Sequence, residues 1–222
     1  MKTVIIDYGS GNLRSAHRAF ERAAIDYKLN HQIVISADPK DIENADYIVL
    51  PGVGAFKDCY DGLKSRTGVF EALHQAVQVQ KKPFLGICVG MQLLATEGIE
   101  YKGSQGLDWI EGRVKIITPN AKIDLGLKVP HMGWNKLSLN QSGQSHAILD
   151  GIEIGEAGLH AYFVHSYQFS PQNADECILT TRYGQQITAM VAKDNMVGTQ
   201  FHPEKSQKLG LDFIANFLTW KP

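Results

Sequence analysis

One cysteine of this chain has neighbours that make it a candidate nucleophile. Cys88 follows the apolar run Phe84–Ile87 and stands between two glycines, Gly86 and Gly90. The pattern predicts a buried strand, a tight turn and the start of a helix. Such a turn lifts the middle side chain out of the fold and holds it over a helix N-terminus, where the positive potential favours a thiolate. A buried core cysteine is the plainer alternative, but the flanking glycines favour a nucleophile.

A possible base and its orienting acid follow a second apolar run. Met196–Phe201 is expected to form a strand, and Pro203 prevents its simple continuation. His202 would take the proton of Cys88 and later protonate a leaving amine, while Glu204 would hold the imidazole in the right tautomer. A strand-end histidine satisfied by solvent is the alternative. Combined with the cysteine turn, the pair predicts a cysteine hydrolase or acyl-transfer site.

Acyl transfer also needs two N–H donors directed at the oxyanion of the tetrahedral intermediate. The backbone N–H of Val89, directly after the nucleophile, is one donor by analogy with nucleophile elbows. The segment Pro51–Gly54 contains two glycines, which let a backbone approach a ligand closely. An ordinary turn after a strand explains this segment equally well. If the loop is functional, the N–H of Val53 is the candidate for the second donor.

Strand-like and helix-like segments alternate over the first half of the chain. The expected strands are Val4–Ile6, Gln32–Ser36, Tyr47–Leu50 and Phe84–Ile87, and the expected helices are Leu13–Ala24, Asp38–Ala45, Phe56–Leu63 and Val69–Gln80. This alternation predicts a parallel sheet with helices on both faces. Ligands of such sheets bind at the carboxyl ends of the strands, where the loops 7–12, 51–54, 88–90 and 202–204 would meet.

After about residue 103 the runs become shorter and more strand-like. They are Arg113–Ile117, Lys136–Leu139, Ala161–His165, Ile178–Thr181, Ile187–Ala192 and Met196–Phe201, followed by a last helix over Gly210–Leu218. Several of them are typical of hairpins added to the sheet. The sequence contains no linker and no repeat, so we expect a single domain over residues 1–222.

The composition argues against several classes of function. The formal net charge is −1, with acids and bases interspersed, so we expect neither nucleic acid nor a membrane surface as a partner. The longest apolar runs are too short to span a bilayer, and Met1–Thr3 leads directly into a strand, so we expect no leader sequence. The three cysteines form no disulfide framework and no CxxC pair, which indicates a reducing, cytoplasmic setting.

No motif in the sequence indicates a cofactor or a metal. The segment Gly9–Gly11 lacks the third glycine of the dinucleotide-binding fingerprint. The eight histidines show no HExxH or comparable spacing. We therefore expect no cofactor and no metal site.

Taken together, these motifs resemble a known family. The segment Gly86-Ile87-Cys88-Val89-Gly90-Met91-Gln92, with His202-Pro203-Glu204, resembles the class I (triad) glutamine amidotransferases. Further segments resemble one branch of that family, the glutaminase subunits of imidazole glycerol phosphate synthases of histidine biosynthesis. These segments are Asp7–Leu13, Pro51–Phe56, Pro130–Asn135, Tyr162–Tyr167 and Gly198–Ser206. The resemblance extends over nearly the whole chain.

The resemblance implies a fold and a reaction. The fold would be α/β and flavodoxin-like, a mostly parallel sheet with helices on both faces and added antiparallel strands in the second half. The reaction would be hydrolysis of L-glutamine to glutamate and ammonia by Cys88, His202 and Glu204. The ammonia would pass through a tunnel to a (β/α)8-barrel cyclase subunit in a heterodimer. There it would join a phosphoribulosyl-formimino ribonucleotide, giving imidazole glycerol phosphate and an aminoimidazole carboxamide ribotide.

The resemblance also implies roles for individual residues. It assigns the oxyanion donors Val53 and Val89, the glutamine-binding residues Gly52, Gln92, Glu100, Ser166 and Tyr167, and the partner-facing residues Asn12, Trp134, Tyr162 and Lys205. The stretch before Glu100, residues 95–99, departs from the usual pattern of the family. Ordinary core packing is the alternative for the two aromatic residues, and a solvated surface charge is the alternative for the lysine.

A coupled glutaminase should not consume glutamine while its partner lacks an acceptor. A glycine-containing loop can turn a peptide plane at low steric cost. We hypothesise that the Val53 N–H points away at rest and swings in when the partner is loaded. Substitution of Gly52 by Ala or Pro is then expected to uncouple or abolish the activity.

Other functions remain open at this level. The chain could be the glutaminase subunit of a pyridoxal phosphate, anthranilate or aminodeoxychorismate synthase, which the co-purifying synthase would reveal. It could be a free-standing cysteine hydrolase or peptidase, which would act without a partner and without preference for glutamine. A non-catalytic binding module is disfavoured, because such a module has no chemical need for Cys88, His202 and Glu204 together.

Overall fold

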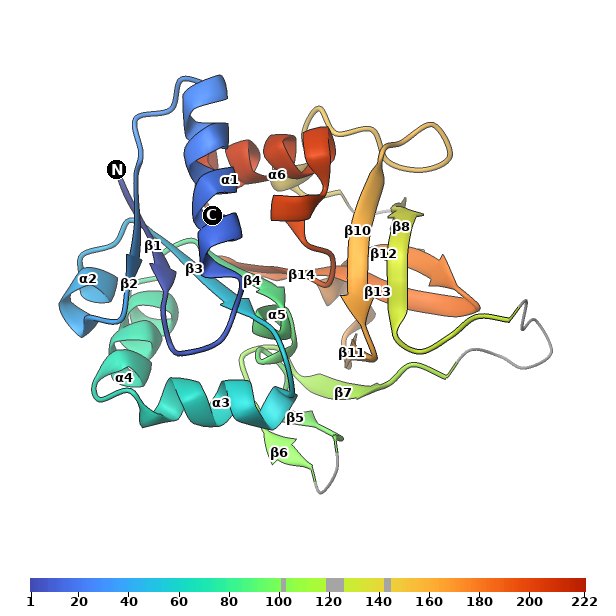
Figure 1. Ribbon diagram of the computed structural model, residues 1–222, viewed down its shortest axis with the longest axis horizontal. Helices are drawn as coiled ribbons and strands as arrows, with labels where there is room; N and C mark the ends of the chain where they lie inside the picture. Colours follow the sequence, from blue (N-terminus) through green and yellow to red (C-terminus); the bar gives the residue numbers. More distant parts are fainter. Residues whose placement is uncertain (101–102, 119–125, 142–144) are drawn as a thin grey trace.

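An eight-stranded sheet runs through the molecule in the order β2-β1-β3-β4-β14-β13-β12-β9 (Figure 1). The structure is a computed structural model that describes residues 1–100, 103–118, 126–141 and 145–222. The strands of this sheet are β1 (Lys2–Ile6), β2 (Gln32–Ser36), β3 (Tyr47–Gly52), β4 (Phe84–Cys88), β9 (Ser138–Leu139), β12 (Cys177–Tyr183), β13 (Gln185–Lys193) and β14 (Met196–Thr199). The strands from β2 to β14 in that order are parallel, and β13, β12 and β9 continue the sheet in antiparallel pairs.

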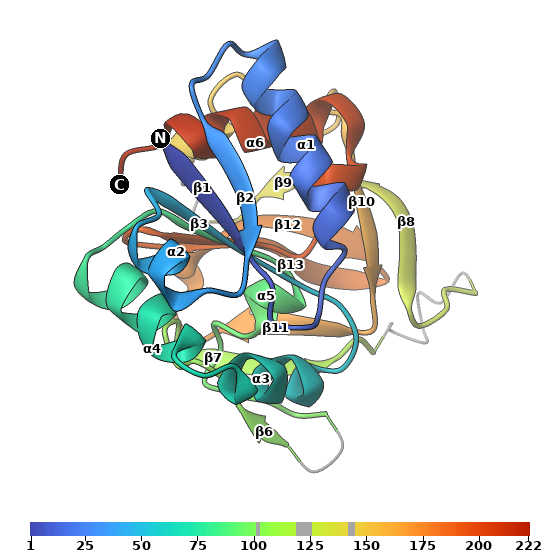
Figure 2. The ribbon, with the colours of Figure 1, turned by 60° about the vertical axis from the view of Figure 1, so that its left-hand side comes forward.

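Helices cover both faces of the parallel part, as expected. The helices α1 (Leu13–Asp26) and α6 (Gln207–Thr219) pack together on one face, and α2 (Pro39–Glu43), α3 (Phe56–Ser65) and α4 (Val69–His74) lie on the other (Figure 2). A π-helical turn over Gln75–Val79 extends α4, and α5 (Val89–Gln92) is a single turn behind β4. Short 3-10 turns lie at Ala147–Leu149, Ala174–Glu176 and Pro203–Lys205. No helix of the described residues is long and apolar enough to cross a bilayer.

The first helix shows how the sequence specifies these elements. The side chain of Asn12 accepts a hydrogen bond from the backbone N–H of Ser15 at 3.4 Å and so caps α1. Ala16 and Phe20 recur at helical spacing and are buried. The ring of Phe20 meets that of Phe217 on α6 edge to face, with centroids 6.3 Å apart. The helix is therefore fixed at its start by a cap and along its length by an apolar stripe.

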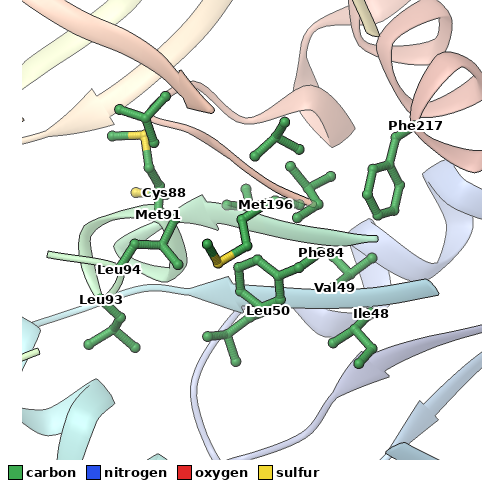
Figure 3. Packing of buried hydrophobic residues seen from close by; sticks show 14 of the residues in the cluster. Ile48, Val49, Leu50, Phe84, Cys88, Met91, Leu93, Leu94, Met196 and Phe217 are labelled. Carbon is green, nitrogen blue, oxygen red and sulfur yellow. The ribbon is translucent and has the colours of Figure 1, made fainter. Parts of the chain in front are cut away.

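The two central strands are buried over their whole length. Every residue of β3 and β4 is buried, and Figure 3 shows Ile48, Val49 and Leu50 beside Phe84. Strands covered on both faces read as continuous apolar runs, which is why the sequence located them without an alternating pattern. Their carboxyl ends finish side by side, with Gly52 paired to Cys88.

The second half departs in part from the expected hairpins. Of the described strands after residue 103, β9, β12, β13 and β14 belong to the main sheet, whereas the small sheets β10-β8 and β11-β7-β5-β6 are separate from it. Their bounds are β5 (Glu97–Gly98), β6 (Ser104–Gln105), β7 (Gly112–Ile116), β8 (His131–Lys136), β10 (His160–His165) and β11 (Tyr167–Pro171). Of the expected strand Lys136–Leu139, the part Ser138–Leu139 is confirmed as β9, whereas Lys136 is the last residue of β8, a strand that was not expected. Most residues of β8 are exposed or half-buried, so its apolar pattern is weak.

Other bounds shift at element ends. The last helix begins at Gln207, earlier than the expected Gly210, and β14 stops at Thr199, earlier than Phe201. The 3-10 turn after His202 leads directly into α6, so the strand ends early and the helix starts early. His202 and Glu204 lie in the connection between strand and helix, as expected.

Candidate active site

Cys88 stands on a strained turn at the carboxyl end of β4. Its backbone has φ 55° and ψ −111°, a conformation that L residues rarely adopt, and it precedes α5 directly. A Cβ added at Gly90 would lie 1.8 Å from the carbonyl oxygen of Leu50, and one at Gly86 would lie 2.5 Å from the carbonyl oxygen of Gly90. Both glycines are therefore required for close packing of the turn against the sheet. Cys88 is 4% exposed.

His202 and Glu204 form a buried pair beside Cys88. The ring Nδ1 of His202 lies 2.7 Å from Oε1 of Glu204, and each side chain is 3% exposed. Nε2 of the same ring is close enough for the Cys88 sulfur to affect its titration, but makes no hydrogen bond of ordinary length within the described residues. Burial alone would lower the pKa of His202, but Cys88 and Glu204 outweigh it and raise that pKa to about 10. The arrangement can hold an imidazolium next to a sulfur nucleophile.

These groups open into a cavity of about 370 Å3. It is lined by Val53, Gly54, Cys88, Val89, Gln92, Glu100, Pro130, Val164, His165, Ser166, Tyr167, His202 and Lys205. Most of the predicted catalytic, oxyanion and substrate residues are thus brought together. Glu204 lies behind His202, and Gly52, Asn12, Trp134 and Tyr162 are not part of the lining. A larger, more open hollow of about 780 Å3 lies over β9, β12 and β13 and contains none of the predicted site residues.

The two expected oxyanion donors differ in their present partners. The N–H of Val89 is the first of α5 and has no acceptor within the helix. The N–H of Val53 instead donates to the hydroxyl oxygen of Ser10 at 3.2 Å, and that hydroxyl also contacts the carbonyl oxygen of Val53 at 2.6 Å. The second donor is therefore engaged by a loop side chain in this structure.

Gly52 has a packing role that was not expected from the sequence. Its φ lies outside the left-handed region, in contrast to Gly54 at φ 97°. A Cβ at Gly52 would lie 2.8 Å from the backbone nitrogen of Gly90 and 2.8 Å from the hydroxyl of Tyr8. The glycine gives room for β3 to pack against the cysteine turn. Gly52→Ala would disturb that packing, so it cannot test rotation of the Val53 peptide.

The predicted substrate residues have contacts of their own. The amide Nε2 of Gln92 donates to the carbonyl oxygen of Tyr167 at 3.0 Å. The backbone N–H of Phe56 donates to Oε2 of Glu100 at 2.8 Å, so this carboxylate caps α3, where Ala55 offers no side-chain cap. Ser166 is half-buried at the cavity wall. One wall of the cavity is thereby joined to the start of a helix.

Three residues of the site were not singled out from the sequence. Gln200 donates from Nε2 to the sulfur of Cys88 at 3.6 Å, Ser10 holds the Val53 peptide, and His165 lines the cavity. A signal was available for the first, which stands two residues before His202 in the same strand-end segment. Ser10 lies in the loop between β1 and α1 and His165 is the last residue of β10, and no spacing in the sequence distinguishes either of them.

The predicted partner-facing residues fall into two groups. The rings of Trp134 and Tyr162 meet at 5.4 Å, and the Nζ atom of Lys205 lies 5.5 Å from the centroid of Tyr162. Tyr162 is linked to the triad, because its carbonyl oxygen accepts from the backbone N–H of His202 at 2.9 Å. Asn12 lies apart from this cluster, exposed at the cap of α1. Among the described residues no group of three or more metal-ligating side chains is close enough to hold a metal ion.

Comparison with known proteins agrees with this geometry. The family model "Glutamine amidotransferase class-I" matches residues 4–220. "Imidazole glycerol phosphate synthase subunit HisH" of Brucella melitensis, of Agrobacterium fabrum and of Rhodospirillum rubrum are each 53% identical over 222 residues, which is 100% of both chains in each case.

Solved structures share the fold at low sequence identity. A glutamine amidotransferase aligns with a TM-score of 0.67 and 18% identity, over 96% of this chain and 98% of its own. A glutamine amidotransferase of Thermotoga maritima aligns with a TM-score of 0.57 and 16% identity, over 92% and 76%. These likenesses establish the fold, and the full-length identities establish the branch. The chain belongs to the class-I glutamine amidotransferase family, and within it to the HisH subunits of imidazole glycerol phosphate synthase.

Proposed function

We propose that this chain is the glutaminase subunit of an imidazole glycerol phosphate synthase and hydrolyses L-glutamine to glutamate and ammonia. The observation that carries the proposal is the buried group Cys88, His202 and Glu204 at the end of a cavity. The whole chain is 53% identical to HisH subunits over their full length. That identity favours this synthase over a pyridoxal phosphate, anthranilate or aminodeoxychorismate synthase.

The reaction proceeds through a thioester. The sulfur of Cys88, as a thiolate, attacks the side-chain carbonyl carbon of glutamine. With a pKa of about 10, His202 carries a proton at neutral pH and gives it to the departing nitrogen, so that the C–N bond breaks and ammonia leaves. The neutral imidazole then takes a proton from water, whose oxygen attacks the thioester. The C–S bond breaks, and glutamate is released.

The cavity wall holds the substrate. Glutamine carries a charged amino group, which the carboxylate of Glu100 can face while its other oxygen caps α3. Ser166 and Tyr167 supply the opposite wall, together with Gln92. Gly52 contributes by letting the loop after β3 approach the nucleophile closely. The cavity of about 370 Å3 is sufficient for an amino acid.

The oxyanion site is completed by a peptide rotation. The N–H of Val89 is available at the start of α5, whereas that of Val53 is bound to Ser10 at 3.2 Å. Turning the Val53 peptide would break the contact with Ser10 and direct the N–H at the oxyanion. The rotation changes ψ of Gly52 and φ of Val53, and a glycine at the first of these two positions has no Cβ to hinder it. Binding of acceptor at the partner would favour the rotated state.

The partner is a (β/α)8-barrel cyclase, which binds the face that carries Trp134, Tyr162, Lys205 and Asn12. Trp134 is 45% exposed and Met132 is 62% exposed, and because they are two residues apart on β8 they lie on the same face of the strand. Neighbouring exposed apolar side chains are typical of a docking surface. The cyclase uses the ammonia to form imidazole glycerol phosphate and aminoimidazole carboxamide ribotide.

The cysteines and the core support a cytoplasmic location and a single domain. The reducing cytoplasm suits a thiol nucleophile in a chain whose cysteines, Cys59, Cys88 and Cys177, are all free. The buried apolar side chains form one cluster that reaches from Val4 to Trp220, which supports a single domain over residues 1–222.

Glutamate release tests the proposal. The chain is assayed with and without the cyclase and its nucleotide ligand, and Cys88→Ala is assayed beside it. We expect release that depends on the loaded cyclase and is lost in the variant. Full activity in Cys88→Ala would overturn the mechanism, and full activity without the partner would overturn the subunit assignment.

A further inference from the structure

A second buried side chain contacts the nucleophile. Gln200 is 0% exposed and follows β14, which is paired in parallel with β4 so that Thr199 lies opposite Ile87. The residues that follow this pair are Gln200 and Cys88, and they therefore lie at the same edge of the sheet. The Nε2 atom of Gln200 lies 3.6 Å from the sulfur, within the range of a hydrogen bond to sulfur.

The orientation of the Gln200 amide is fixed by its neighbours. The Nε2 atom of Gln92 lies 3.0 Å from the carbonyl oxygen of Tyr167 and 2.9 Å from Oε1 of Gln200. A backbone carbonyl can only accept, so Gln92 must present its NH2 group there. Gln200 must in turn present its oxygen to Gln92 and its NH2 group to Cys88. The direction of each donor thus follows from the chain of contacts.

We propose that Gln200 holds the Cys88 thiolate through an N–H···S hydrogen bond, with its amide oriented by Gln92 from the carbonyl of Tyr167. The inference rests on the proposed role of Cys88 as nucleophile, and it gives the sulfur a hydrogen-bond donor of its own, whereas Nε2 of the nearby His202 makes no hydrogen bond of ordinary length within the described residues. A hydrogen bond to an ionised acceptor is stronger than a hydrogen bond to a neutral acceptor. Gln200 therefore favours the thiolate before attack and again when the C–S bond breaks and sulfur leaves.

The same contacts join the substrate wall to the nucleophile. Tyr167 lines the cavity, and its carbonyl oxygen also accepts from Nδ1 of His165 at 2.8 Å. A displacement of the backbone at Tyr167 would therefore be transmitted to Cys88 through the side-chain amides of Gln92 and Gln200. A merely structural role for Gln200, as the acceptor of Gln92, would leave the ionisation of the sulfur unchanged, and this difference can be measured.

The test uses Gln200→Met and Gln200→Leu, which keep the apolar bulk and lack the donor. Iodoacetamide modification of Cys88 is followed from pH 5 to 10 by peptide mass spectrometry. We expect its pH midpoint to rise by about one to two units, and kcat/KM for glutamine with the loaded cyclase to fall by about tenfold to a hundredfold. Gln78→Met is the matched control, since Nε2 of Gln78 donates to the sulfur of Met196 at 3.1 Å, away from the cavity. It should keep the natural midpoint.

A natural midpoint in either folded variant overturns the inference. If neither variant folds, the natural chain decides, because an amide proton that binds the thiolate moves downfield in its NMR spectrum as the thiolate forms. The Gln200 side-chain resonance should follow the alkylation midpoint, and its failure to move contradicts the proposal. Cys88→Ala separates the two levels: if it remains active the proposed function fails, and if it is inactive while Gln200→Met behaves naturally, only this inference fails.

Discussion

Two buried histidines show how neighbours set the charge of a residue. The contacts of His202 with Cys88 and Glu204 raise its pKa to about 10 in spite of burial. His165 is buried against a carbonyl oxygen and the ring of His131, whose Nδ1 lies 3.0 Å from its Nε2. Burial lowers the pKa of His165 to about 3. One imidazole is thus kept charged and the other neutral in the same cavity.

The neutral state of His165 predicts acid sensitivity. Below about pH 6.5 the unfolded chain binds a proton at this residue, whereas the folded chain binds it only near pH 3. The free energy of unfolding should therefore fall as the pH falls through this window, with a slope of up to about 1.4 kcal/mol per pH unit from this group. Urea unfolding of the natural chain and of His165→Gln at several pH values measures it. Equal slopes for the two proteins would show that His165 does not stay neutral.

At the scale of elements, the cysteine turn depends on how closely it packs against β3. A Cβ added at Gly90 would lie 1.8 Å from the carbonyl oxygen of Leu50. With any side chain at position 90, β3 and the turn could therefore not both keep their positions. The same contact holds Cys88 above the sheet edge where β4 and β14 end together. The strand-turn-helix unit therefore acts as a rigid mount for the nucleophile.

Gly90→Ala should consequently unfold or deform this unit. We expect a loss of about 3 kcal/mol or more in the free energy of unfolding, together with loss of glutamate release. Gly151→Ala is the control, since an added Cβ there meets nothing within 4 Å and only its φ of 72° is unfavourable, which costs about 1 kcal/mol. Thermal unfolding of both variants decides, and a Gly90 variant as stable as the control would show that the packing can relax.

The loop after β3 gives a second prediction for an element. Ser10→Ala removes the acceptor of the Val53 N–H without adding bulk. If the contact with Ser10 holds the Val53 peptide in its resting direction, glutamate release without the nucleotide ligand of the cyclase should increase several-fold. Loss of one hydrogen bond limits this increase to about tenfold. The measurement is glutaminase activity with and without the nucleotide ligand of the cyclase. An unchanged basal rate would mean that Ser10 does not restrain the loop.

The central strands and the cysteine turn could be predicted from the sequence, because each has a physical requirement that restricts its residue types. The central parallel strands β3 and β4 are buried on both faces, and the glycines beside Cys88 are required by close backbone contact, so both are recognisable in the sequence. Strand β8 was missed because its side chains are largely exposed. The roles of Ser10 and Gln200 depend on partners more than 40 residues away in sequence, and a single sequence does not reveal such pairs.

At the scale of the molecule, the active site and the proposed docking face are one continuous structure. Trp134 on β8 contacts Tyr162 on β10, and Tyr162 accepts from the backbone of His202. Lys205, which lies over Tyr162, also lines the cavity. A partner seated on Trp134 would therefore be two contacts from His202, which gives a short path for coupling.

Trp134→Ala should weaken association with the cyclase. Large aromatic side chains at the centre of an interface commonly contribute about 2 kcal/mol or more, so we expect the dissociation constant to rise at least about thirtyfold. Val79→Ala, at a 58% exposed apolar side chain on the π-helical turn, should leave it unchanged. Isothermal titration calorimetry with the cyclase compares them. Equal weakening by both substitutions would remove Trp134 from the docking face.

Cys88 is expected to carry the glutamyl group during catalysis. The direct measurement is rapid acid quenching of the chain, mixed with loaded cyclase and L-glutamine, followed by peptide mass spectrometry. We expect a γ-glutamyl thioester on the peptide that contains Cys88. In Cys88→Ala we expect no such adduct and no glutamate release. A glutamyl adduct on Cys59 or Cys177 instead, or continued glutamate release by Cys88→Ala, would contradict it.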